Sequence, residues 1–202
     1  MRTIWNVLFA LTSLSLASGA DFSLDTNKID QVTGLKGKLN TEEAVYKVSS
    51  PRTDIKILVD NWQMPPFMGL TSWAAFTAGK EKDAMVMGDL VLMQDEVSGV
   101  MRTALENGLE VTALHNHFFF DEPKVYFMHI GGEGSADELS RAVRSALDKV
   151  KEIRAATPQP GRSFGREQLP ATSSLNTEAL ATLLNVKGEA KDGMFKAVFG
   201  TR

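Results

Sequence analysis

The fold is decided by residues 84–132, AMVMGDLVLMQDEVSGVMRTALENGLEVTALHNHFFFDEPKVYFMHIGG. The apolar run over 84–93 predicts a buried strand, and apolar residues at helical spacing predict a helix over 95–107. Two more strands are predicted at 109–117 and 124–130, with a turn between them. The order strand, helix, strand, strand is that of a split β-α-β unit, as in ferredoxin-like sandwiches.

The flanking segments extend this unit into a larger sheet. Strands are predicted at 44–49, 53–59 and 72–78. Ser135 and Glu138 form a capping box that opens a long helix with apolar residues at helical spacing. We therefore expect an α+β fold, a mostly antiparallel sheet with packed helices that contains the split β-α-β unit.

The first residues have the pattern of a signal peptide. Arg2 precedes an apolar stretch over 4–16, and small residues follow at 17–20. We predict cleavage after Ala20 and a mature protein in the periplasm or outside the cell. An uncleaved anchor is the alternative, but the apolar stretch is shorter than the roughly 20 residues that span a bilayer.

The composition narrows the class of partners. The formal net charge is −3 and no block of Lys or Arg occurs, so no nucleic-acid partner is expected. No second apolar run is long enough to cross a membrane, so we expect no transmembrane segment after signal cleavage. The chain has no cysteine, which excludes both disulfides and lipid attachment through cysteine.

The start of the mature chain resembles its end. Residues 23–38 (SLDTNKIDQVTGLKGK) and 174–189 (SLNTEALATLLNVKGE) share five of 16 positions. This favours an internal repeat, with chance similarity between two capped helices as the alternative. We predict a domain over 21–154, a Pro/Gly-rich linker over 155–173, and the start of a truncated second repeat over 174–202, a segment through which two chains could form a homodimer.

The three histidines of the chain form the main candidate site. His115 and His117 are two residues apart, so a strand would place both on one face. A hairpin centred near Glu122 would put His129 opposite His115. Three converging imidazoles predict a divalent transition-metal site, zinc or copper, with Glu122 as a candidate fourth ligand. The alternative is a metal-free polar site in which the histidines bind carboxylates or an organic anion.

Aromatic and acidic residues near the histidines predict a ligand pocket. Its candidate residues are Phe118, Phe119, Phe120, Trp62, Asp95 and Glu96. Asp95 is also the predicted cap of the helix over 95–107. No G-x-S-x-G motif occurs, which argues against a serine hydrolase, and no catalytic residue is identified. Two functions remain open: an exported metal-binding protein of unknown activity, or a non-catalytic module that binds a small ligand or a cell-envelope component.

Two long stretches resemble a known family. Residues 51–76 (PRTDIKILVDNWQMPPFMGLTSWAAF) and 88–132 are similar to the LppY/LpqO family, and the resemblance extends over about residues 23–152. It implies an exported domain that is often present in two copies, without an established activity. Since the cysteine of a lipoprotein is missing here, lipid anchoring is not carried over.

A looser resemblance concerns the first cupin motif. Gly108, His115, His117 and Glu122 have nearly the spacing of that motif, but His129 stands where it has glycine. The predicted helix over 95–107 also does not suit a cupin barrel, so the α+β fold is preferred.

Overall fold

The computed structural model describes residues 23–161, 174–191 and 194–200. The chain divides into two compact units, residues 1–162 and 163–202. The predicted signal peptide and most of the predicted linker lie outside the described residues. The long helix continues to Ala156, two residues into the predicted linker.

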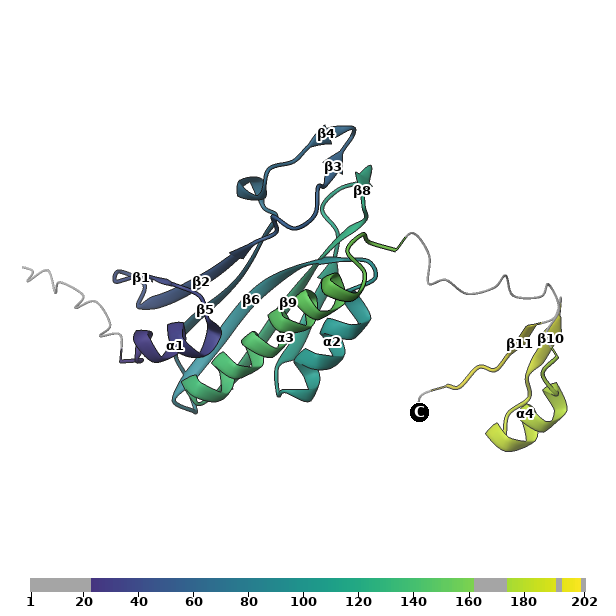
Figure 1. Ribbon diagram of the computed structural model, residues 1–202. Helices are drawn as coiled ribbons and strands as arrows, with labels where there is room; N and C mark the ends of the chain where they lie inside the picture. Colours follow the sequence, from purple (N-terminus) through teal and green to yellow (C-terminus); the bar gives the residue numbers. More distant parts are fainter. Residues whose placement is uncertain (1–22, 162–173, 192–193, 201–202) are drawn as a thin grey trace, which may run out of the picture. The chain divides into compact units, whose positions relative to one another are not determined.

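The first unit is an α+β structure, as the sequence predicted. In chain order its elements are α1 (Thr26–Thr33), β1 (Lys38–Asn40), β2 (Val45–Pro51), β3 (Leu58–Val59), β4 (Trp62–Gln63), the 3-10 helix η1 (Pro66–Met68), β5 (Thr71–Ala78), β6 (Ala84–Met93), α2 (Val97–Glu106), β7 (Glu110–His115), β8 (Asp121–Glu122), β9 (Val125–Gly134) and α3 (Ala136–Ala156). Six strands form one antiparallel sheet in the order β1-β2-β5-β6-β9-β7, and β4-β3-β8 form a small second sheet (Figure 1).

The predicted split β-α-β unit is confirmed. Strands β6 and β7 both pair antiparallel with β9, so they run parallel to each other with β9 between them. Helix α2 makes the connection from β6 to β7, and α3 follows β9. Strands β6 and β9 pair along their whole length without a register shift, from Ala84 opposite Gly134 to Met93 opposite Val125.

One predicted strand is wrong. Of residues 53–59, only Leu58–Val59 form a strand, and these pair with β4 and β8 instead of the main sheet. The chain leaves the main sheet after Pro51, because the side chain of Arg52 turns inward to a buried carboxylate and Ile57 is buried in a second core cluster. Alternation of apolar residues alone did not reveal this change of sheet.

The helices cover one face of the main sheet. Figure 1 shows α1, α2 and α3 on the same side of it, and their apolar residues form one buried cluster with every second residue of the strands. Strand residues of this cluster include Tyr46, Val48, Phe76, Val86, Leu90, Met128 and Ile130. Because strand side chains alternate, the other residues of these strands face away from the helices. That uncovered surface is called the open face below.

The described part of the second unit contains α4 (Thr177–Leu184) and an antiparallel hairpin of β10 (Glu189–Lys191) and β11 (Met194–Lys196). Helix α4 has no buried residue. Across the described parts of both units, no helix combines the length and apolarity that a membrane span requires.

Candidate functional site

A row of side chains crosses the open face over five strands. Cross-strand pairing places Ser49 opposite Trp73, Trp73 opposite Asp89, Asp89 opposite His129, and His129 opposite Ala113. Direct cross-strand partners project to the same face, with Cβ atoms about 4.5–5.5 Å apart. Residues from distant parts of the sequence therefore meet on this face, with Asp89 and His129 as direct neighbours.

His115 and His129 are in contact. Their Nε2 atoms are hydrogen-bonded at 3.1 Å, and the tautomers decide which ring donates and which accepts. The ring centroids are 4.8 Å apart with nearly perpendicular planes. The predicted register was wrong by two residues, since His115 stands opposite Phe127. The reason is that Asp121 and Glu122 pair with β3 and do not form a simple turn between β7 and β9. Because the shift is even, both histidines stay on the same face, so they still meet.

His117 joins this pair from beyond the end of β7. Its ring centroid lies 4.8 Å from that of His115 and 4.3 Å from that of Phe127, which it meets edge-on. The side chain is exposed. The structure thus brings the three predicted histidines together, although His117 reaches the cluster from a loop rather than by strand alternation.

Asp89 is the member of the cluster that the sequence analysis missed. Its Oδ2 lies 3.8 Å from Nε2 of His129, and its Oδ1 is buried without a hydrogen-bond partner. A buried carboxylate oxygen without a partner is costly and calls for an explanation such as an ion or a water molecule. The available signal was that Asp89 is the single charged residue in the apolar run 84–93.

The histidine pair has a spacing that suits metal ligands. Bonds of about 2.0–2.1 Å in a tetrahedral site place two imidazole nitrogens roughly 3.3 Å apart, close to the 3.1 Å between His115 and His129. Within the ranges that the structure describes, no group of three or more His, Asp or Glu side chains is arranged to hold a metal ion as it stands. Two of the three histidines, His115 and His129, therefore already have a spacing close to that of two ligands of one metal ion.

A hollow of about 540 Å³ opens beside the histidines on the open face. Its lining includes Lys47, Phe67, Met68, Trp73, Asp89, His117, Phe118 and Phe127. The amino group of Lys47 lies 4.2 Å from the centre of the Trp73 ring. Of the predicted pocket aromatics, only Phe118 lines this hollow. The side chains of Phe119 and Phe120 are 92% and 77% exposed, and Trp62 on β4 is also exposed.

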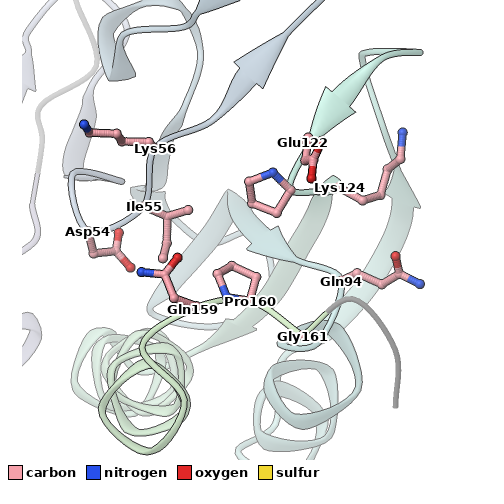
Figure 2. Close-up of a pocket in the computed structure, with 10 residues that line it drawn as sticks. Asp54, Ile55, Lys56, Gln94, Glu122, Lys124, Gln159, Pro160 and Gly161 are labelled. Atoms are coloured by element: carbon pink, nitrogen blue, oxygen red, sulfur yellow. The ribbon is translucent and has the colours of Figure 1, made fainter. Parts of the chain in front are cut away.

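Glu122 belongs to a different hollow. This second hollow, of about 710 Å³, is lined by Asp54, Lys56, Gln94, Glu122 and Lys124, among others. Figure 2 shows these side chains around it. The structure does not bring Glu122 to the histidines, because β8 pairs with β3 away from the main sheet.

Glu96 lies inside the protein and is not a pocket residue. Its side chain is fully buried and accepts two hydrogen bonds from Arg52, at 2.7 and 2.9 Å, and one from the Met93 amide at 2.7 Å. Nε of Arg154 lies 2.9 Å from its Oε1. The neighbouring Asp95 binds Arg154 and accepts a hydrogen bond from the Gly161 amide.

These ion pairs also correct the predicted helix cap. The N-cap residue of α2 is Glu96, not Asp95. Its side chain does not cap the helix, because it accepts hydrogen bonds from Arg52 and from the Met93 amide instead. Burial acts to lower the pKa of Arg52, but hydrogen bonds and charges from Asp54 and Glu96 outweigh it and raise the pKa. Burial likewise acts to raise the pKa of Asp54, and Arg52 reverses this to a net lowering. We call these five residues the ion network: Arg52, Glu96 and Arg154 are buried, Asp95 is partly buried, and Asp54 is exposed.

The structure is an α+β domain that brings three histidines and Asp89 close together on its open face. Its sequence matches a family model described as Domain of Unknown Function (DUF1259) over residues 27–149. The match covers more than half of the chain, so the protein belongs to this family of uncharacterised domains. No curated protein and no solved structure matches the chain.

Proposed function

We propose that this protein binds a divalent transition metal on the open face, with His115 and His129 as ligands. The observation that carries the proposal is the 3.1 Å distance between their Nε2 atoms. Imidazole nitrogen is a good ligand for zinc and copper, the two metals we favour. Glu122 is not proposed as a ligand, since it lines another hollow.

Asp89 and His117 are the proposed additional ligands. The unpartnered Oδ1 of Asp89 is a buried acceptor next to His129, and a cation would satisfy it. The exposed ring of His117 already touches the ring of His115. Completing the shell requires these two side chains to rotate when the metal binds, because three donors are not yet arranged around one point.

A small organic ligand is the second candidate, and the hollow of about 540 Å³ favours it. Asp89 and His117 line that hollow, so a metal held by the histidines would lie at its wall. Aromatic walls with a few polar groups are typical of ligand sites. Ligand binding without metal is the alternative function.

We also propose that the chain is a member of the LppY/LpqO group and that it works in the periplasm or outside the cell. The stretches 51–76 and 88–132 support the first assignment. The signal-peptide pattern of residues 1–20 supports the second.

Metal content tests the proposed site. The protein, produced without a histidine tag and dialysed against zinc or copper, is expected to retain about one metal ion per chain by elemental mass spectrometry. His129→Ala is expected to abolish retention, because one of the two preformed ligands is lost. Leu114→Ala, an exposed change on the same strand pair, serves as the control and should retain the metal.

Two results would argue against the metal site. One is a wild-type protein that retains no zinc or copper, and the other is equal retention by His129→Ala. If ligand screening by thermal shift then finds compounds that stabilise the metal-free protein, the second candidate function replaces the first.

A further inference from the structure

The hollow of about 540 Å³ on the open face has a positively charged end on β2. Lys47 lines the hollow, and so does Ser49, two residues further along the same strand. Tyr46 and Val48, on either side of Lys47, are buried in the core between sheet and helices, so Lys47 and Ser49 both project from the open face. An ammonium group and a hydroxyl group, both hydrogen-bond donors, therefore belong to this end of the hollow.

An aromatic ring holds the ammonium group of Lys47 at the hollow. Its Nζ lies 4.2 Å from the centre of the Trp73 ring, and both residues line the hollow. The face of an indole ring attracts a cation but does not neutralise its charge. In the described parts of the chain, no carboxylate forms an ion pair with Lys47. The hollow thus contains a positioned cation without an anionic partner.

A second lysine adds positive charge at the same place. Lys38 on β1 is the direct cross-strand partner of Lys47, so the two side chains project to the same face. Like charges directly opposite each other are destabilising, and an anion between them would relieve the repulsion. Glu43, in the turn between these strands, accepts a hydrogen bond from Asn40 instead.

At its other end the hollow is negatively charged. Asp89 lies there, two strands away from β2, with its Oδ2 3.8 Å from Nε2 of His129. Neighbouring strands are about 4.8 Å apart, so the two ends are roughly 10 Å apart across the sheet. An anionic group is attracted at the Lys47 end and repelled at the Asp89 end. This charge arrangement selects one orientation for a ligand with a single carboxylate.

Much of the remaining lining is apolar and aromatic. Phe118 and Phe127 contribute to it, with their ring centroids 6.2 Å apart in an edge-to-face arrangement. From η1, Phe67 and Met68 line the hollow, although their side chains are 98% and 57% exposed. A ring that enters the hollow would contact these side chains and remove apolar surface from water.

We propose that this hollow binds an organic carboxylate with an aromatic body. The carboxylate pairs with Lys47 and accepts a hydrogen bond from Ser49, while the aromatic body packs against the phenylalanine and methionine side chains. A volume of about 540 Å³ lies within the range of about 300–1,000 Å³ for small-molecule sites. The inference rests on the second candidate function, ligand binding at this hollow, and it does not require a metal ion at the histidines.

Calorimetric titration with three probes of one ring system tests the class of ligand. Naphthoate is an anion, naphthalenemethanol is neutral and naphthylmethylammonium is a cation, each with its substituent at the same ring position. Protein freed of metal by dialysis against a chelator is expected to bind naphthoate roughly tenfold more tightly than the neutral probe, the order of a hydrogen bond to a charged group. The cation should bind more weakly than both.

Variants locate the binding. Lys47→Met is expected to bind naphthoate and the neutral probe equally, because it keeps an unbranched side chain but loses the charge, and Lys47→Arg should keep the preference for the anion. Lys56→Met, the matched control, removes a lysine that lines the other hollow and should bind as the wild type does. Phe67→Ala should weaken both probes, and since this side chain is 98% exposed, its loss does not disturb the core.

Three results would overturn the inference: equal binding of naphthoate and the neutral probe by the wild type, an unchanged preference in Lys47→Met, or no binding of any probe to the metal-free protein. Failure of the metal site gives a different result. Protein that binds naphthoate but retains no zinc or copper supports the ligand class and contradicts the metal site. Protein that retains metal but binds no probe contradicts the ligand class alone.

Discussion

Replacing Glu96 by glutamine is expected to lower the free energy of unfolding by about 3 kcal/mol. The carboxylate is fully buried and lies between Arg52 and Arg154, which are 5% and 8% exposed. Removing its charge leaves two buried guanidinium groups with less compensation. Breaking a buried ion pair from one side is costly for this reason.

Urea denaturation monitored by tryptophan fluorescence measures this effect. Glu106→Gln removes an exposed carboxylate from the same helix and should change the stability by less than about 0.5 kcal/mol. Glu96 links the end of β6, through the Met93 amide, to the start of α2 and, through Arg154, to the end of α3. Equal stability of Glu96→Gln and the wild type would contradict a stabilising role for these links.

Replacing His115 by alanine is expected to weaken zinc binding by more than roughly 100-fold. Mutation of a residue that only hydrogen-bonds to a metal ligand already lowers metal affinity by about 10–100-fold, and loss of the ligand itself should lower it further. His115 supplies one of the two nitrogens that are already 3.1 Å apart. His117→Ala should have a smaller effect, because its side chain is exposed and has to rotate to reach the metal.

Competition with a zinc indicator measures these affinities, and Glu122→Gln is the matched control. Glu122 was the carboxylate predicted as a fourth ligand, but it lines the other hollow, so the variant should bind zinc as the wild type does. Equal losses for Glu122→Gln and His115→Ala would mean that β8 moves to the histidines, contrary to the observed pairing with β3.

Much of the fold could be predicted because its signals are local. The apolar run over 84–93 became β6 without a change of bounds, and the capping box at Ser135 became the start of α3. The order β6-β9-β7 followed from the split β-α-β pattern, whereas the places of β1, β2 and β5 in the sheet were not predicted. Residues 53–59 were wrongly predicted as one strand, because alternating apolar residues occur in any half-buried segment. The path of the backbone there depends on the ion pair between Arg52 and the distant Glu96.

The site was less predictable because it depends on pairing between distant strands. The histidines share one sequence window, so their meeting was foreseen even with the wrong register. Asp89 was missed, since only the register of β6 with β9 places it beside His129. Glu96 was mistaken for a pocket residue because nothing near it in sequence indicates that Arg52 and Arg154 surround it.

The location of the metal tests the central claim most directly. Crystals of the zinc-loaded protein, measured on both sides of the zinc absorption edge, give an anomalous difference map. We predict one strong peak within bonding distance, about 2.0–2.1 Å, of Nε2 of both His115 and His129. A map without a peak at these histidines, or with the peak elsewhere on the chain, would contradict the proposed site.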